Sequence, residues 1–144
     1  MTRTDVLVVG AGPVGLFLAA ELRAGGADVV VLERLPRPTG ESRASILHAR
    51  TMEIFADRGL LPRLGELPPV GPGHFGGLRL DLAEADPDHP YAGQWECLQH
   101  HLETELQAYA LESGAEIRRG HTVTGLGPSG ERVPVAVRGP APDR

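Results

Sequence analysis

Cysteine is nearly absent from this sequence, because Cys97 is the only one among 144 residues. A single cysteine excludes an internal disulfide and is typical of proteins in a reducing cytoplasm. Basic residues are not in excess either: the formal net charge of −5 argues against nucleic acid as a partner. The sequence also lacks any run of about 20 apolar residues, so it predicts no membrane-spanning helix. We therefore expect a cytoplasmic globular domain.

Metal-ligand spacing is missing as well. Cys97, His100 and His101 stand close together, but adjacent histidines on a helix point about 100° apart and cannot face one ion together with Cys97. No second Cys/His pair follows at a zinc-site spacing. The other histidines lie beside no serine or cysteine in a nucleophile arrangement. The sequence thus predicts no metal ligand.

A βαβ unit is clearly present at residues 5–33. A Val/Leu-rich strand at 5–9 leads into the glycine turn 10–15, a helix continues to Ala24, and a second strand at 28–32 ends at Glu33. Continuous apolar strands are typical of a parallel sheet covered on both faces. The helix is expected to bury one stripe, formed by Val14, Phe17, Leu18 and Leu22.

The glycine turn has the pattern of a dinucleotide-binding loop. Gly10 would allow a sharp turn, Gly12 would let a pyrophosphate approach the backbone, and Gly15 would let helix and strand pack closely. The pyrophosphate would lie at the helix N-terminus, where Pro13 fits the first helical position. Glu33 is placed to accept a ribose hydroxyl, and its charge would repel a 2′-phosphate. These features predict FAD or NAD rather than NADP.

The rest of the chain alternates short elements with proline-rich connections. We expect a helix at 49–58 with Met52 and Phe55 on its inner side, an extended connection at 61–74, and a half-buried strand from Leu78 with Gly76–Gly77 as a bulge or a close-approach site. Apolar periodicity predicts a second long helix at about 97–113, with Leu98 on its buried face. Strands are expected at 115–119, 122–126 and 133–137, the last two joined by a hairpin turn at 127–130.

Several of these segments together carry a family resemblance. The glycine turn, Glu33–Arg34, Gly40–Ala44 and Ala49–Phe55 resemble the N-terminal part of single-component FAD-dependent aromatic hydroxylases, the p-hydroxybenzoate hydroxylase group. Gly73–Leu78 is similar to the bacterial enzymes that hydroxylate fused-ring aromatic polyketides such as angucycline precursors. The resemblance implies an α/β, Rossmann-like FAD-binding fold of the glutathione-reductase type, with a parallel sheet and an appended β-hairpin or meander. It makes residues 1–144 the N-terminal portion of that domain, with 44–48 and 70–96 as excursions towards a substrate-binding region.

The resemblance also implies cofactor contacts at individual positions, but no catalytic residue. Pyrophosphate contacts are implied at Gly10, Gly12, Pro13, Val14 and Gly15; Glu33 and Arg34 would surround the adenosine ribose, Arg43 and Gln99 would lie near the pyrophosphate and ribityl chain, and Val123 near the adenine. From position alone, Arg43 would be an ordinary loop arginine. Glu41 departs from the hydroxybenzoate enzymes, which carry a basic residue there.

In such enzymes NAD(P)H reduces FAD, O₂ forms a flavin C4a-hydroperoxide, and its distal oxygen is transferred to an activated aromatic ring. The enzymes run to several hundred residues, so the chain is expected to be a fragment of a longer or cleaved enzyme, or a natural half-protein. Two other readings stay open. In the first, the chain is a non-catalytic FAD-binding or interaction module that pairs with a partner. In the second, it is a minimal NAD-binding domain, in which Arg43 and Gln99 lack a role.

Overall fold

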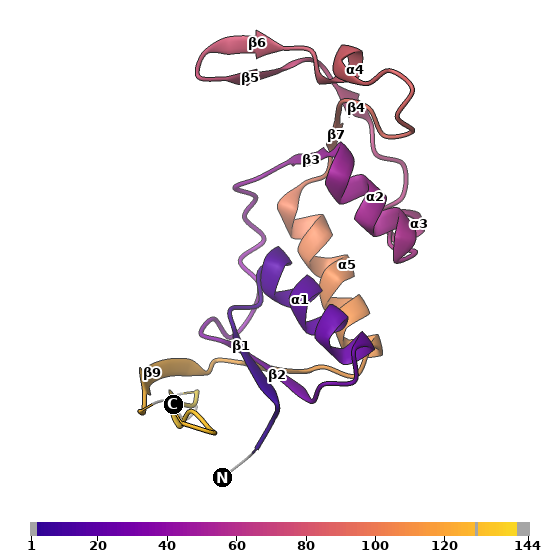
Figure 1. Ribbon diagram of the computed structural model, residues 1–144. Helices are drawn as coiled ribbons and strands as arrows, with labels where there is room; N and C mark the ends of the chain where they lie inside the picture. Colours follow the sequence, from indigo (N-terminus) through magenta and orange to yellow (C-terminus); the bar gives the residue numbers. More distant parts are fainter. Residues whose placement is uncertain (1–2, 129, 141–144) are drawn as a thin grey trace. The chain divides into compact units, whose positions relative to one another are not determined.

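The computed structural model describes residues 3–128 and 130–140, which divide into two compact units. The first unit comprises Met1–Gly40 and Leu106–Arg144, and the second comprises Glu41–Glu105. Helix α5 (Gln99–Glu112) begins in the second unit and ends in the first. Figure 1 gives the course of the chain through both units.

The first unit is built on a parallel sheet of three strands. These are β1 (Val6–Val9), β2 (Val29–Glu33) and β8 (Glu116–Arg119), in the order β1-β2-β8. Val6 pairs with Val29, and Val30 pairs with Glu116. The predicted βαβ unit and the three parallel strands are thereby confirmed. Because β2 lies in the middle, its residues Val29–Leu32 are all buried, as expected for a covered parallel sheet.

Helix α1 (Pro13–Ala24) connects β1 to β2 and lies along the sheet (Figure 1). Its predicted buried stripe was wrong. Leu16, Ala19 and Ala20 are buried, whereas Val14 and Leu18 are 82% and 45% exposed. Apolar residues lie on nearly every side of α1, so their periodicity did not identify the side that packs against the sheet. Small alanines take that face because the glycine turn brings the helix close to the strands.

An antiparallel pair completes the first unit. Strand β9 (Thr122–Leu126) pairs with β10 (Val135–Arg138), with an irregularity between Ala136 and Val137. The hairpin is as predicted, although its second strand begins two residues later than expected. Part of the predicted turn, Ser129, lies outside the described residues. The closing contact is the bond from the Gly127 N–H to the Pro134 carbonyl, at 2.7 Å.

The second unit contains short strands and helices. The predicted helix at 49–58 is α2 (Ala49–Asp57), which buries Met52 and Phe55 as expected. A small sheet in the order β3-β7-β4 joins Ile46–His48, Gln94–Glu96 and Pro69–Val70. None of these three strands was predicted, although residues 69–70 fall in the segment expected to be extended. The other short helices are α3 (Leu61–Leu64) and α4 (Leu82–Ala85). The segment 61–74 is therefore not simply extended.

A separate hairpin in the second unit corrects another prediction. Strands β5 (Gly73–Phe75) and β6 (Leu78–Leu80) pair with each other around Gly76 and Gly77, both at positive φ. Gly76–Gly77 is thus a tight turn instead of a bulge. The expected buried face is absent: residues 74–80 are all exposed, with Phe75 at 77% and Leu78 at 71%. Figure 1 shows this hairpin as a ribbon of its own beyond β4.

Helix α5 starts later than its periodicity predicted. It begins at Gln99, so Leu98 precedes it and is 44% exposed instead of lying on the buried face. Leu102, Leu106 and Ala110 form the buried stripe. The helix ends at Glu112, before Gly114 at a positive φ of 90°. A glycine in that conformation commonly ends a helix.

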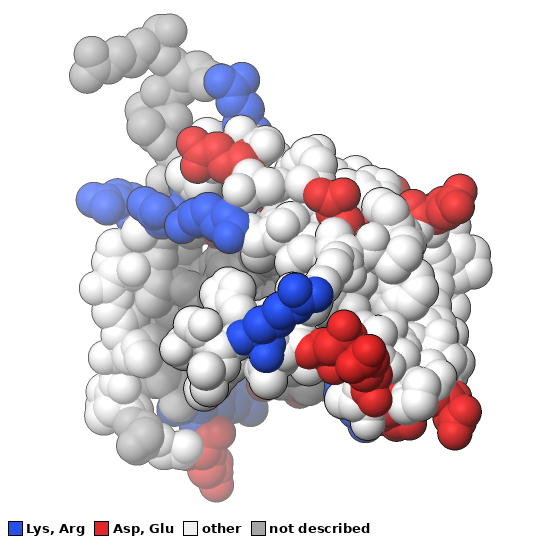
Figure 2. All heavy atoms as spheres, turned by 90° about the horizontal axis from the view of Figure 1, so that it is seen from above, with Lys and Arg blue, Asp and Glu red and all other residues white. Residues whose placement is uncertain are grey.

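Surface charge is dispersed. On the face drawn in Figure 2, acidic and basic side chains stand among large uncharged areas, without a dominant basic field among the described residues. None of the described helices is both long and apolar enough to cross a membrane.

Candidate cofactor-binding site

The glycine turn between β1 and α1 has the backbone geometry of a phosphate-binding loop. Gly10 has a φ of +104°, a conformation that other residues rarely adopt. A Cβ on Gly15 would overlap the carbonyl oxygen of Gly10, so only glycine permits this close approach. A Cβ on Gly12 would meet nothing within 4 Å. Gly12 therefore opens onto free space at the point where the sequence places a pyrophosphate.

The N-terminus of α1 faces that open space with its amide groups. Pro13 occupies the start of the helix, and the N-cap residue Gly12 has no side chain that could accept the first helical N–H groups. An open hollow of about 540 Å³ adjoins the turn, and its lining combines Gly10, Gly12, Pro13 and Gly15 with the apolar side chains of Val6–Val9, Val14 and Leu18. Free N–H groups and the positive end of the helix dipole favour an anion at such a position. These residues fit the pyrophosphate of a dinucleotide.

Glu33 joins the end of β2 to the glycine turn. One carboxylate oxygen accepts the Ala11 N–H at 2.9 Å, and the other accepts the Leu35 N–H at 2.8 Å. Each oxygen keeps further acceptor capacity for a ligand hydroxyl. Partial burial acts to raise the pKa of Glu33, but the two N–H bonds, together with the charges of Arg119 and Arg34, outweigh it and leave the pKa below 4.5. Glu33 is therefore an anion, and its bond to the Ala11 N–H also holds the glycine turn against the end of β2.

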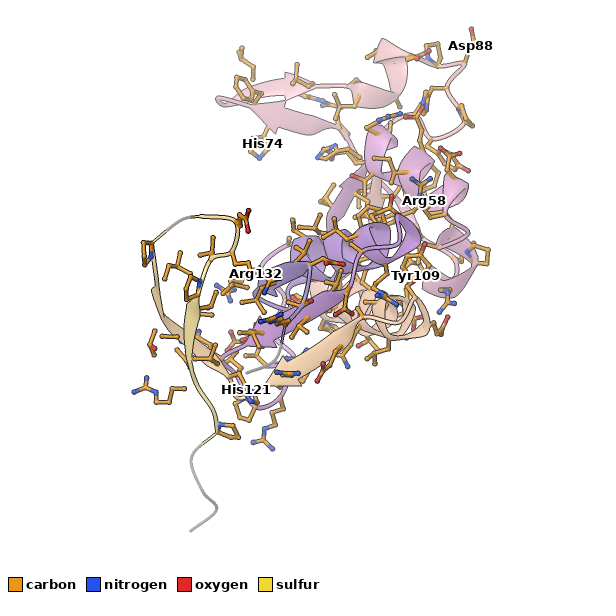
Figure 3. The ribbon with its side chains drawn as sticks, turned by 60° about the horizontal axis from the view of Figure 1, so that its bottom comes forward. Arg58, His74, Asp88, Tyr109, His121 and Arg132 are labelled. Carbon is orange, nitrogen blue, oxygen red and sulfur yellow. The ribbon has the colours of Figure 1, made fainter. Side chains whose placement is uncertain are left out.

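A second set of side chains, which the sequence did not reveal, lies at the same end of the sheet. Arg119 is the register partner of Glu33 in β8, and its guanidinium donates to Gln107 Oε1 from Nε at 3.2 Å and from Nη2 at 2.6 Å. His121, labelled in Figure 3, donates from its backbone N–H to the Glu33 carbonyl at 2.9 Å. Only the folded structure reveals this set, through the pairing of β2 with β8 and the contact of β8 with α5, because residues 33, 107 and 119 have no local sequence pattern in common.

Arg34 and Val123 are the other two residues that the resemblance places near the adenosine. Arg34 follows β2 and is exposed. Val123 lies in β9, half-buried, opposite Val137 of β10. Both belong to the first unit, as do the glycine turn and Glu33.

In the second unit the structure brings Arg43 and Gln99 together. Gln99 Oε1 accepts the Arg43 backbone N–H at 3.3 Å, while its Nε2 donates to Glu103 at 2.7 Å. The Gln99 N–H donates to the Ala44 carbonyl at 3.0 Å. Gln99 is therefore fixed at the start of α5 rather than turned freely to water. The contact joins two segments that the resemblance assigned to one region of the cofactor.

Ser42 supports the same helix start. Its Oγ accepts the His100 N–H at 3.3 Å and lies 2.9 Å from His100 Nδ1. A serine oxygen on a free helical N–H is a capping interaction, supplied here from outside the helix. The loop 42–44 thus lies against the first turn of α5 within the second unit.

Two further titratable groups, Glu53 and His89, are structural partners of each other. His89 Nε2 lies 2.8 Å from Glu53 Oε1, and Arg50 bonds the other Glu53 oxygen at 2.8 Å. Cys97 is buried, which raises the pKa of its thiol. Within residues 3–128 and 130–140, no group of three or more His, Cys, Asp or Glu side chains is arranged to hold a metal ion.

Comparison with known proteins identifies the family. Residues 3–144 match the family described as FAD binding domain. The chain is 46% identical over 141 residues to 12-dehydrotetracycline 5-monooxygenase/anhydrotetracycline 6-monooxygenase of Streptomyces rimosus, covering 96% of this chain and 28% of that protein.

Two solved structures share the fold as well as the sequence. The OxyS anhydrotetracycline hydroxylase from Streptomyces rimosus matches with a TM-score of 0.87 and 44% identity, over 96% of this chain and 29% of that one. CabE, an aromatic hydroxylase from angucycline biosynthesis, matches with a TM-score of 0.85 and 47% identity, over 96% and 28%. The chain thus spans less than a third of the length of these relatives. As its motifs predicted, it belongs to the FAD-binding domain family, with tetracycline and angucycline hydroxylases among its relatives.

Proposed function

We propose that this chain is the FAD-binding portion of an NAD(P)H- and O₂-dependent monooxygenase that hydroxylates a fused-ring aromatic polyketide. The observation that carries the proposal is the glycine turn. Gly12 opens onto free space at the N-terminus of α1, and Glu33 stands at the end of the neighbouring strand. This arrangement supports FAD binding, and the activities named for the similar proteins support the reaction class.

Each named residue has a role that follows from its chemistry. The amides at the start of α1 would bind the pyrophosphate, and Glu33 would accept a hydroxyl of the adenosine ribose. Arg34 and Val123 would surround the adenosine. Arg43 and Gln99, which are in contact, would hold the ribityl and pyrophosphate side. None of these residues needs to act as an acid or base.

FAD bound at this site would store the two electrons that NAD(P)H donates before they reach O₂. In the whole reaction, one oxygen atom enters an aromatic C–H bond as a hydroxyl group, and the other leaves as water. NAD(P)⁺ is released. The contribution of this chain is to bind and orient the cofactor.

The second unit supplies the proposed excursions towards the substrate, at 44–48 and 70–96. Phe75, Leu78 and Leu80 of the β5–β6 hairpin are exposed apolar side chains, and His74 projects from the same hairpin (Figure 3). Such a surface suits a flat aromatic ligand or the protein surface around it. We place the enzyme in the cytoplasm, in keeping with its single cysteine.

The first test is the visible absorbance of the purified 144-residue chain after FAD is added and the sample is desalted. A retained and shifted flavin band supports the cofactor assignment, and preferential retention of NAD contradicts it. Hydroxylation is then tested in the protein extended to the length of its relatives, by NAD(P)H-dependent O₂ uptake with a fused-ring phenol. FAD retention without any such uptake would favour the non-catalytic module.

A further inference from the structure

The side-chain amide of Gln99 is held by hydrogen bonds at both of its ends. Its Oε1 accepts the Arg43 backbone N–H at 3.3 Å, and its Nε2 donates to Glu103 Oε1 at 2.7 Å. All three residues belong to the second unit, and Gln99 and Glu103 are half-buried in the first part of α5. The amide is thus the middle member of a chain of contacts that leads from the helix to the loop.

The chemistry of these two neighbours fixes the orientation of the amide. A backbone N–H only donates, so the Gln99 oxygen must face Arg43. An ionised glutamate only accepts, so the Gln99 nitrogen must face Glu103. Turning the amide by 180° would break both bonds, and it would set donor against donor and acceptor against acceptor. Both contacts therefore select the same one of the two orientations.

This orientation presents a donor to a ligand. The bond to Glu103 uses one of the two Nε2 hydrogens, so the second can donate to a phosphate or hydroxyl oxygen of a cofactor. The same residue also fixes the loop, because the Gln99 backbone N–H donates to the Ala44 carbonyl at 3.0 Å. The exposed side chain of Arg43 thus leaves the loop beside the start of α5.

We propose that Glu103 is a positioning residue for the ribityl and pyrophosphate side of the FAD site. It holds the Gln99 amide so that the nitrogen donates to the cofactor while the oxygen keeps its bond to the Arg43 N–H. The proposal rests on the FAD-binding function proposed above, in which Gln99 and Arg43 contact the cofactor. Glu103 acts on the cofactor through Gln99.

The simpler role for Glu103 is to stabilise the helix. Gln99 and Glu103 are four residues apart, and side chains at this spacing on a helix often bond each other. The contact with Arg43 favours positioning, because it carries the amide out of the helix to a residue 56 positions away in the sequence. A pair that served the helix alone would change stability without changing FAD affinity, so the test must measure both the amide and the ligand.

Four substitutions separate these roles. E103M removes the acceptor at nearly the same length, whereas E103Q is the conservative variant because its amide oxygen still accepts from Gln99. E105M is the matched control. It removes the same charge from a half-buried residue of α5 that lies two positions further on and therefore points to another side of the helix. Q99M removes the amide itself.

The experiment measures two quantities for each variant and the wild-type chain. The first is the position of the Gln99 side-chain NH₂ signals by NMR in the FAD-free chain, assigned with Q99M. The second is FAD affinity by fluorescence titration. In E103M we expect the NH₂ signals to move to those of a free glutamine, and FAD binding to weaken about threefold, the effect of one lost hydrogen bond. E103Q should retain most of the affinity, and E105M should change neither quantity.

The double variant Q99M/E103M tests whether Glu103 acts through Gln99. In the Q99M background, E103M should cause no further loss of FAD affinity, because the residue that it positions is already gone. An additional loss of the same size as in the wild-type background would overturn the proposal. Unchanged NH₂ signals or unchanged FAD affinity in E103M would also overturn it and leave the pair as a helix contact.

Two further outcomes are distinguishable. If E103M fails to fold, E103A replaces it, since alanine has the highest helix propensity. Failure of the wild-type chain to bind FAD would refute the proposed function separately. The NMR signals of the free chain would still decide whether Glu103 holds the Gln99 amide.

Discussion

Gly15 and Gly10 touch across the turn from β1 to α1, so closely that a methyl group on Gly15 would overlap the Gly10 carbonyl oxygen. That oxygen is backbone and cannot swing away as a side chain would. Gly12 lies between them in sequence, yet a methyl group there would meet nothing within 4 Å. One loop thus contains a glycine required for packing and a glycine that leaves space for a ligand.

The G15A variant should lose stability. The added Cβ forces the first turn of α1 away from the end of β1, a form of overpacking that costs about 1–3 kcal/mol. Urea unfolding followed by far-UV circular dichroism measures the loss. A G15A chain as stable as the wild type would mean that α1 moves away freely.

The G12A variant should behave in the opposite way. Gly12 has a φ of −83°, which alanine adopts without strain, so the free energy of unfolding should change by less than about 0.5 kcal/mol. The methyl group would instead occupy the space proposed for the pyrophosphate, and FAD affinity should fall more than about tenfold. Equilibrium dialysis with FAD measures the affinity. Retained binding in G12A would move the pyrophosphate away from this turn.

Glu33 should make stability depend on pH. Because its folded-state pKa is lowered from 4.5, its stabilising contribution is present above that pH and is lost as the pH falls through the lowered value. E33Q offers one acceptor atom in place of two, so one of the Ala11 and Leu35 amides then faces an NH₂ group. At pH 7 we expect E33Q to be less stable by up to about 1 kcal/mol, a modest value because the carboxylate is partly exposed.

Urea unfolding at pH 7 and at pH 3 measures this effect. The gap between wild type and E33Q should narrow as the pH falls through the lowered pKa of Glu33, because the carboxylate then takes up a proton. E66Q, a change at an exposed carboxylate, is the control and should show almost no gap at either pH. A gap of equal size at both values would assign the role of Glu33 to its shape instead of its charge.

Ser42 should stabilise the start of α5. S42A removes the oxygen that accepts the His100 N–H, and the loss of a cap costs about 1 kcal/mol. S42D keeps an acceptor near the helix N-terminus and should recover most of the loss. Thermal unfolding of the three chains gives the comparison. Equal melting temperatures for S42A and the wild type would show that water replaces the cap at no cost.

The first unit could largely be predicted from sequence because its signals are local. Gly10, Gly12 and Gly15 fall between two runs of Val and Leu, and each run is long enough to define a strand. The inner face of α1 was missed for a physical reason. Val14 and Leu18 are as apolar as a core residue, and only the close approach at Gly15 shows that alanines must face the sheet.

The second unit was less predictable because its strands have only two or three residues. Pairing of Ile46–His48 with Gln94–Glu96 joins distant segments, and neither segment is long enough to show alternation. The Arg43–Gln99 contact depends on this pairing, so only the resemblance pointed to it. The same limit hid Gln107 and Arg119, which meet through the packing of a helix and a strand.

The two bonds of Glu33 have a consequence for redesigning nucleotide preference. An engineer who wants the protein to accept a 2′-phosphate would first replace this acid, since its charge repels the phosphate. The same substitution deletes the acceptor of the Ala11 and Leu35 amides, so the redesigned loop would lose its anchor together with its selectivity. A successful exchange therefore needs two changes, one that admits the phosphate and another that supplies a neutral acceptor for the Ala11 amide.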